Sequence, residues 1–265
     1  MAILDEIVAH KRTEVASKKD LYPIKLLERS IYYQTPVVSL KKYLSRNDRV
    51  GVIAEIKRQS PSRGIINEHI SVEQLSIGYM QSGASALSVL TDAKFFGGKN
   101  EDLTVARKFN FCPILRKEFI IDEYQIIEAK SIGADAILLI AKILTPKEIA
   151  NFSSVAKKLG LEVLLEVHSE KELLDNVEQN IDIFGVNNRN LDTLAVDVKL
   201  SLELAAKIPS MAVKISESGI ESAETIRSLK SAGYSGFLIG ETFMKTSSPE
   251  KACARLISEV LSQPG

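Results

Sequence analysis

The sequence predicts an α/β protein built as an eight-stranded parallel βα barrel with an N-terminal helical extension. Three observations lead to this prediction: short apolar runs alternate with amphipathic, helix-like stretches, the alternation repeats eight times, and successive runs end about 20 to 34 residues apart. Such spacing accommodates a strand, a helix of about three turns and two short loops. A connection of this length returns the chain to the same edge of the sheet, so neighbouring strands should pair in parallel.

The predicted strands are short runs of β-branched and other apolar residues that end in polar residues or glycine. They are Val50–Lys57, Ala86–Thr91, Pro113–Lys117, Ala136–Ile140, Glu162–Val167, Ile183–Asn187, Ala212–Glu217 and Gly236–Gly240. An open, doubly wound sheet is the alternative, but no Gly-x-Gly-x-x-Gly fingerprint opens the first βα unit. The units share no repeated motif, which argues against a solenoid. The count of eight therefore favours a closed TIM barrel.

Local signals mark where the predicted helices begin and end. Ser71 precedes one helical stretch, Thr145-Pro146 supplies an N-cap residue and a first-turn proline, and Ser169 with Glu172 has capping-box spacing. Glycines follow several helical stretches at the place where a C′ glycine ends a helix. These glycines are Gly83, Gly133, Gly160 and Gly233.

The first 49 residues lie outside the eight units and are predicted to be helical. Ile3, Leu4, Ile7 and Val8 have the spacing of one apolar helix face, which should pack on the barrel. No Gly/Ser-rich linker follows this segment. The chain is therefore predicted to be a single domain over residues 1–265, with an extension at 1–49 and the barrel at 50–265.

Composition excludes several classes of function. Thirty-four Lys and Arg balance 34 Asp and Glu, so the chain lacks the basic surplus expected of proteins that bind nucleic acid or acidic membranes. No apolar run approaches the roughly 20 residues of a membrane span, and no uninterrupted apolar segment for secretion opens the chain. Cys112, Cys253 and the three histidines form no metal-ligand pattern. We therefore expect a soluble, cytoplasmic enzyme rather than a protein that binds charged polymers.

Polar residues collect at the carboxyl ends of the predicted strands. They are Glu55 and Lys57 at the first strand, Lys117 and Glu118 at the third, Glu166 and His168 at the fifth, Asn187 and Arg189 at the sixth, and Glu217, Ser218 and Gly219 at the seventh. In a βα barrel these ends form the active-site face. A structural ion pair explains any one charge equally well. Convergence from several strands instead predicts a catalytic cavity in which charges shift each other's pKa.

The loops after the last two strands predict a phosphate site. Ser218-Gly219 leads into a helix, and Gly240-Glu241 closes the eighth strand. Glycines allow backbone N–H groups to approach an anion, and these two loops are a frequent phosphate site in such barrels. Ordinary turn glycines are the alternative. The Glu241 side chain would repel a phosphate, so it should point away.

Five motifs in order resemble those of indole-3-glycerol phosphate synthase, and the resemblance covers essentially the whole chain. The motifs are Ile53-Ala54-Glu55-Ile56-Lys57-Arg58-Gln59-Ser60-Pro61-Ser62, Ile114-Leu115-Arg116-Lys117-Glu118-Phe119-Ile120, Leu164-Leu165-Glu166-Val167-His168, Gly185-Val186-Asn187-Asn188-Arg189-Asn190-Leu191 and Ser216-Glu217-Ser218-Gly219-Ile220. The resemblance implies closure of 1-(2-carboxyphenylamino)-1-deoxyribulose 5-phosphate to an indole ring, with loss of CO2 and water. It implies no cofactor and no metal.

The resemblance also implies roles for individual residues. Lys117 matches the general acid of ring closure, Lys57 a lysine that contacts the substrate carboxylate, and Glu166 a general acid/base with Glu55 as its carboxylate partner. Which lysine drives dehydration stays open. Asn187 and Ser218 complete the expected catalytic set; Arg189, Glu217 and Ser60 are expected to contact substrate; and Ser218, Gly219, Gly240 and the Glu241 backbone N–H are expected to hold the phosphate.

Apolar residues near the strand ends are candidates for the pocket that receives the aromatic ring. They are Phe96, Phe119, Ile140 and Leu191. An equally good explanation is that they are loop anchors and core residues. His168 is expected to support the site from behind Glu166. Where the family often has serine after the glycine of the eighth strand, this chain has Glu241, which argues against a side-chain phosphate contact there.

Three other functions compete with the synthase. A phosphoribosylanthranilate isomerase would share the barrel and phosphate site but would need a cysteine and an aspartate, and Cys112 precedes the third strand. A Schiff-base aldolase could use Lys57 or Lys117 as its nucleophile. A non-catalytic protein that binds a phosphate ligand would not need Lys57, Lys117 and Glu166, so their presence argues against it.

Overall fold

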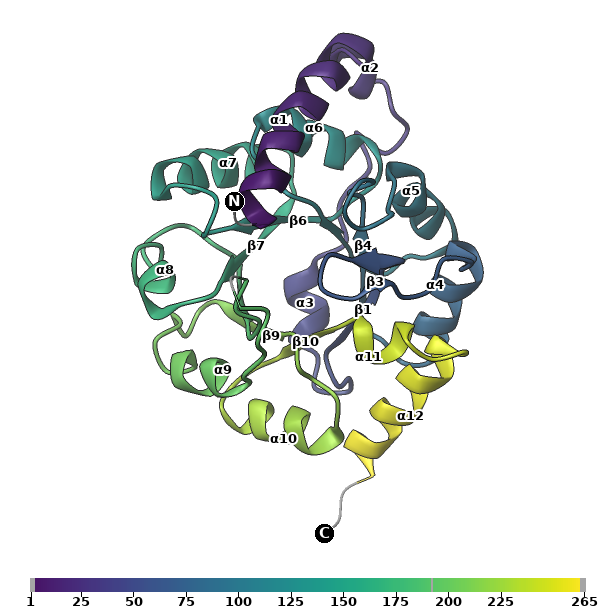
Figure 1. Ribbon diagram of the computed structural model, residues 1–265, viewed down its shortest axis with the longest axis vertical. Coiled ribbons are helices and arrows are strands. Elements are labelled where there is room, and N and C mark those ends of the chain that lie inside the picture. Colours follow the sequence, from purple (N-terminus) through teal and green to yellow (C-terminus); the bar gives the residue numbers. More distant parts are fainter. Residues whose placement is uncertain (1–2, 192, 263–265) are drawn as a thin grey trace.

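The computed structural model describes residues 3–191 and 193–262 and contains a closed barrel of eight parallel strands (Figure 1). The strands are β1 Val52–Ile56, β4 Ala86–Leu90, β5 Ile114–Lys117, β6 Ala136–Ile140, β7 Glu162–Val167, β8 Ile183–Asn187, β9 Val213–Glu217 and β10 Gly236–Ile239. Closure comes from β1, which pairs with β4 on one side and β10 on the other. The eight predicted strands are confirmed, and a short hairpin of β2 Gln59–Ser60 and β3 Gly64–Ile65 follows the first of them.

Helices surround the barrel as an outer ring (Figure 1). They are α4 Val72–Gln81, α5 Asn100–Phe109, α6 Glu123–Ser131, α7 Pro146–Lys158, α8 Glu170–Leu174, α9 Lys199–Leu204, α10 Ala223–Ser231, α11 Glu241–Met244 and α12 Pro249–Leu261. Strands buried on both faces read as continuous apolar runs, as parallel sheets require. Polar residues also occur within the strands, among them Ser88 in β4 and Arg116 in β5, but those that line the cavity lie at the strand ends or just beyond them.

The predicted helix signals are confirmed with one correction. Ser71 and Thr145 cap α4 and α7, and Thr145 forms a complete capping box with Glu148. Gly83, Gly133, Gly160 and Gly233 all have positive φ, as C′ glycines do. Ser169 caps α8, but the Glu172 carboxylate accepts the backbone N–H of His168 at 2.8 Å instead of completing the box. Glu172 is thereby held beside the His168 ring.

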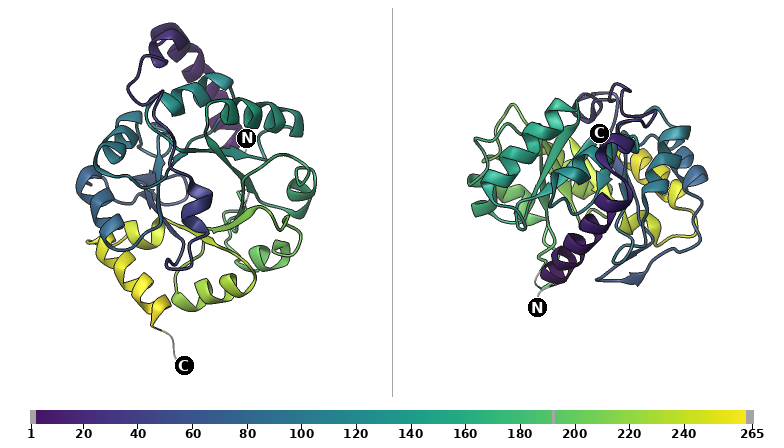
Figure 2. Two further views of the ribbon diagram at one scale, coloured as in Figure 1. Left: turned by 180° about the vertical axis from the view of Figure 1, so that it is seen from behind. Right: turned by 90° about the horizontal axis from the view of Figure 1, so that it is seen from above.

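The extension forms α1 Ile3–Leu21, α2 Ile24–Leu27 and α3 Leu40–Leu44, and it covers both ends of the barrel. Leu40 and Leu44 of α3 are buried with interior residues of the strands, and Figure 2 (left) shows α3 across the opening from behind. Glu162 at the start of β7 holds this helix, accepting from Ser39 Oγ at 2.5 Å and Lys41 N at 2.8 Å. At the opposite end, α1 and the β2–β3 hairpin project together (Figure 2, right).

The predicted apolar face of α1 is confirmed in outline. Leu4 and Ile7 are buried, whereas Ile3 and Val8 are half-buried. The barrel loops contribute Phe95, Phe96 and Phe119, which pack with Ile3, Leu4 and Ile7. The face therefore covers the loops at the carboxyl ends of the strands. Within residues 3–191 and 193–262, no helix has both the length and the apolar character needed to cross a membrane.

Candidate active site

A cavity of about 470 Å³ opens at the carboxyl ends of the barrel strands. Every residue that the sequence predicts for the site lies on its wall: Glu55, Lys57, Ser60, Phe96, Lys117, Phe119, Ile140, Glu166, Asn187, Arg189, Leu191, Glu217, Ser218, Gly219, Gly240 and Glu241. Sequence reasoning missed Ile3, Leu4 and Ile7, which bring α1 into the wall. The apolar spacing that predicted an α1 packing face was the available signal, but it could not say which end of the barrel that face would cover.

The charged floor of the cavity centres on Lys117 at the end of β5. Its Nζ lies 2.7 Å from Glu166 Oε2 and also contacts Glu217 Oε2. Lys57 forms a separate pair with Glu55, with 2.7 Å between Nζ and Oε1. The set is therefore two ammonium groups facing three carboxylates, and Glu217 shares Lys117 with Glu166.

Two glycines make room for these carboxylates. A Cβ added at Gly240 would lie 2.3 Å from Glu55 Oε1, and one at Gly185 would lie 2.4 Å from Glu217 Oε1. Such distances are far inside ordinary van der Waals contact, so a side chain at either position would displace the acid. Gly240, predicted only as a phosphate ligand, thus also shapes the acid cluster.

Burial and mutual charge shift the pKa values of the three central groups, which are Lys117, Glu166 and Glu217. Burial disfavours the charge on Lys117, but the surrounding carboxylates of Glu166, Glu217 and Glu55 outweigh it and raise the pKa of this lysine. For Glu166, burial acts against ionisation, yet Lys117 and His168 lower its pKa well below the usual range. Burial, reinforced by the Glu166 charge, raises the pKa of Glu217 to about 7. Glu217 can therefore exchange a proton near neutrality while Glu166 stays ionised.

His168 lies between two carboxylates behind this floor. Its Nε2 is 3.2 Å from Glu166 Oε1 and its Nδ1 is 3.5 Å from Glu172 Oε2, and the ring is 6% exposed. Burial works against the imidazolium, but Glu166 and Glu172 raise the pKa of His168 to about 9. A protonated ring there favours the ionised form of Glu166.

Replacing His168 by asparagine should flatten the pH dependence of stability above neutrality. Because folding raises the pKa of His168 from 6.5 to about 9, the stabilisation is complete below pH 6.5 and lost as the pH rises to about 9. Each pKa unit is worth about 1.4 kcal/mol, so the loss amounts to about 3 kcal/mol. The melting temperature of the wild type should fall more between these pH values than that of His168→Asn. The exposed His69→Asn is the control, and equal slopes for all three proteins would refute the effect.

The loops after β9 and β10, which are predicted to hold a phosphate, form another side of the cavity. Ser218 and Gly219 both have positive φ, 67° and 74°, and the Ser218 hydroxyl donates to Asn187 Oδ1 at 2.9 Å. The carboxylate of Glu241 is held by Arg63 at 2.9 Å and by Arg189 at 3.3 Å. Its charge is thereby matched by two guanidinium groups, one of them from the β2–β3 hairpin.

The remaining wall is apolar. The rings of Phe96 and Phe119 lie 5.8 Å apart between centroids at an angle of 38°. Ile140 and Leu191 join them on the wall, with Leu4 and Ile7 from α1. This side can receive a flat, apolar group, whereas the floor presents proton donors and acceptors to it.

Cys112 lies away from this chemistry. It precedes β5, whose other end carries Lys117, and it is buried at the amino end of the barrel. Burial raises the pKa of its thiol to about 12. Cys112 therefore cannot serve the acid/base role that an isomerase of the same fold would require. Over the residues that the structure describes, no group of three or more His, Cys, Asp or Glu is arranged to hold a metal ion.

Solved structures with low sequence identity match the fold. A thiamine phosphate pyrophosphorylase from Pyrococcus furiosus has a TM-score of 0.59 at 14% identity, covering 84% of this chain and 100% of its own. An N-acetylmannosamine-6-phosphate 2-epimerase from Clostridium perfringens has a TM-score of 0.59 at 16% identity, covering 77% of this chain and 90% of its own. At this identity the likeness concerns the barrel alone.

Curated relatives are far more similar in sequence. An indole-3-glycerol phosphate synthase from Bacteroides thetaiotaomicron is 46% identical over 258 residues, which cover 97% of this chain and 98% of that protein. Enzymes of the same name from Caldanaerobacter subterraneus (43% identity, 92% and 93% covered) and Campylobacter jejuni subsp. doylei (38% identity, 96% and 100% covered) are also similar. The model of the indole-3-glycerol phosphate synthase family matches residues 4–256. The chain, with its eight-stranded barrel and its cavity of paired lysines and glutamates, thus belongs to the indole-3-glycerol phosphate synthase family.

Proposed function

We propose that this cavity converts 1-(2-carboxyphenylamino)-1-deoxyribulose 5-phosphate into indole-3-glycerol phosphate, CO2 and water, with Lys117 as the acid of ring closure. The observation that carries the proposal is the contact of the Lys117 ammonium with both Glu166 and Glu217 on the cavity floor. An aromatic wall and a loop face rich in serine and glycine flank this floor. The substrate has a matching division into an aryl group, a ketone and a phosphate.

Ring closure requires a proton donor at the ketone oxygen. The aromatic carbon that carries the carboxylate attacks the ketone carbon, and the carbonyl π electrons move to oxygen. An alkoxide is far more basic than an amine, so the Lys117 ammonium can protonate it despite its raised pKa. The ammonium also stabilises the negative charge as it develops. Lys57, which pairs with Glu55, would contact the substrate carboxylate until it leaves as CO2.

Dehydration then removes the new hydroxyl together with a proton from the carbon next to nitrogen. One group must protonate the leaving hydroxyl, and another must accept the carbon-bound proton. Glu217 suits the acid role because its pKa of about 7 leaves it partly protonated near neutrality. Glu166, ionised beside Lys117 and His168, suits the base role. This assignment extends the sequence-based role of Glu217, which was predicted only to contact substrate.

The phosphate would occupy the opposite side of the cavity. Ser218, Gly219 and Gly240 line that side together with Arg63 and Arg189. The positive φ of Ser218 and Gly219 turns the loop there, in a conformation that can expose backbone N–H groups to an anion. Asn187 would orient Ser218 through the hydrogen bond between its Oδ1 and the serine hydroxyl.

A direct assay tests the proposed function. Purified protein incubated with the aminodeoxyribulose phosphate should produce the absorbance and fluorescence of an indole ring and release one equivalent of CO2. A folded sample that yields no indole product would refute the proposal. Borohydride added during turnover should trap no covalent adduct, whereas a Schiff-base aldolase that used Lys57 or Lys117 would be trapped.

A further inference from the structure

Lys11 of α1 is a completely buried lysine outside the cavity. Its Nζ lies 2.8 Å from Glu14 Oε2, 2.9 Å from Asp92 Oδ2 and 3.0 Å from Glu118 Oε1, and its side chain is 0% exposed. A lysine is almost never fully buried unless it is paired. Asp92 and Glu118 follow β4 and β5, so one ammonium joins the N-terminal helix to two loops of the barrel mouth.

Both of these carboxylates hold the backbone of the aromatic residues that line the cavity. Asp92 Oδ1 accepts the N–H groups of Phe95 at 2.6 Å and Phe96 at 3.0 Å. Glu118 Oε1 accepts the N–H of Phe119 at 2.9 Å. The ammonium therefore neutralises the same carboxylates that fix the two loops. The rings of Phe96 and Phe119, in contact with each other, form the apolar wall.

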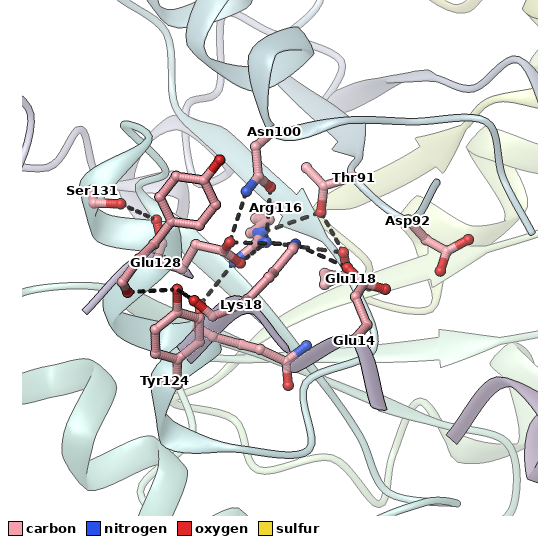
Figure 3. A network of polar contacts seen from close by, with 12 residues as sticks. Glu14, Lys18, Thr91, Asp92, Asn100, Arg116, Glu118, Tyr124, Glu128 and Ser131 are labelled. Carbon is pink, nitrogen blue, oxygen red and sulfur yellow. Dashed lines mark hydrogen bonds and ion pairs between the residues drawn. The ribbon is translucent and has the colours of Figure 1, made fainter. Parts of the chain in front are cut away.

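A network of polar contacts supports the Glu118 side of this arrangement (Figure 3). Thr91 donates to Glu118 Oε2 at 2.7 Å, and the buried Arg116 donates to Thr91 at 3.1 Å and to Glu128 at 2.5 Å. Glu118 is thus constrained from the barrel side. From the side of α1, the Lys11 ammonium pairs with both Asp92 and Glu118 and so joins the two loops.

We propose that Lys11 is a positioning residue that sets the affinity of the cavity for the aryl group of its substrate, acting through Asp92 and Glu118 on the Phe96 and Phe119 wall. The proposal rests on the proposed function for the identity of the aryl ligand. Lys11 does not line the cavity. Its loss should therefore weaken binding, while the groups that transfer protons on the cavity floor stay in place.

Replacing Lys11 by methionine keeps the length of the side chain and removes its charge. The KM for the aminodeoxyribulose phosphate should rise about tenfold, while kcat stays within about threefold of the wild type. Hydrogen exchange in the unliganded protein should speed up at the amides of Phe95, Phe96 and Phe119 by about tenfold, because their acceptors are no longer held. Asp92→Asn is the second variant, which keeps the proposal testable if Lys11→Met does not fold. The asparagine keeps an oxygen that can accept hydrogen bonds but loses the ion pair with Lys11. The lysine still has Glu14 and Glu118 as partners.

Lys19→Met is the matched control. Lys19 also joins α1 to the barrel, through an exposed pair with Asp122 at 2.7 Å that does not reach the aromatic wall. This variant should keep wild-type KM and amide exchange. A folded Lys11→Met or Asp92→Asn protein with wild-type KM and exchange, or one with lowered kcat and unchanged KM, would overturn the proposal. If even the wild type makes no indole product, the proposed function fails, whereas the exchange rates still decide whether Lys11 holds the wall.

Discussion

Lys117→Met should lower kcat by about 10² to 10⁴ while changing KM by less than about threefold. The substitution removes the proton donor and the positive charge that lie against Glu166 and Glu217. The proposed binding surfaces for the aryl group and the phosphate are made by other residues of the cavity wall, so ground-state binding should change little. Steady-state assays of indole formation at saturating substrate measure the effect.

The fold of this variant needs a separate check because two buried carboxylates lose their partner. Glu217, whose pKa is already about 7, can take up a proton and relieve the repulsion, so we expect a folded protein. Circular dichroism would verify the fold. Lys171→Met provides a matched control, because Lys171 is 83% exposed on α8 and, within residues 3–191 and 193–262, its ion-pair partner is Asp175. Turnover of Lys117→Met within about threefold of the wild type would remove this lysine from the mechanism.

Glu166→Gln should lower kcat by about 10² with little change in KM. The amide keeps the shape of the side chain but cannot accept the proton released in dehydration. The substitution also removes the neighbouring charge that helps to raise the pKa of Glu217, so that carboxyl should ionise at lower pH. Measuring kcat from pH 5 to 9 tests both effects, because the limb of the profile that reports Glu217 should move to lower pH.

Glu172→Gln is the control for this prediction. Glu172 contacts the same histidine as Glu166, at 3.5 Å from Nδ1, but it does not line the cavity. Its substitution therefore perturbs His168 without removing a group that faces substrate. Should Glu172→Gln and Glu166→Gln lose activity equally, the loss would come from His168 and the base role of Glu166 would be wrong.

Much of the fold could be predicted because the alternation of strands and helices depends on patterns among neighbouring residues. Parallel strands buried on both faces are predominantly apolar, so runs such as Ala136–Ile140 stand out from the amphipathic helices between them. Caps such as Thr145 and C′ glycines such as Gly133 satisfy helix ends from neighbouring residues alone. The end of β7 shows the limit: the sequence spacing of Ser169 and Glu172 fitted a capping box, but Glu172 bonds to His168 instead.

The strand-end residues that line the cavity were also predictable, but the ion pairs among them were not. Parallel strands bring all their carboxyl ends to one face, so Glu55, Lys117, Glu166 and Glu217 were bound to gather there once the barrel was inferred. Lys117 is 49 residues from Glu166 and 100 residues from Glu217, and no local pattern encodes which acid it meets. The stagger of neighbouring strands determines which of these side chains lie close enough in space to pair.

By itself, the sequence determined the eight strands, the helix ends, the family motifs and the set of residues at the barrel mouth. Only the tertiary structure decided that α1 forms part of the cavity wall, that Gly240 gives Glu55 its space, and that Lys11 joins this helix to two loops. The physical reason is the range of the forces involved. Strand and helix patterns depend on neighbouring residues, whereas a buried charge is stable only beside partners that folding brings from distant parts of the chain.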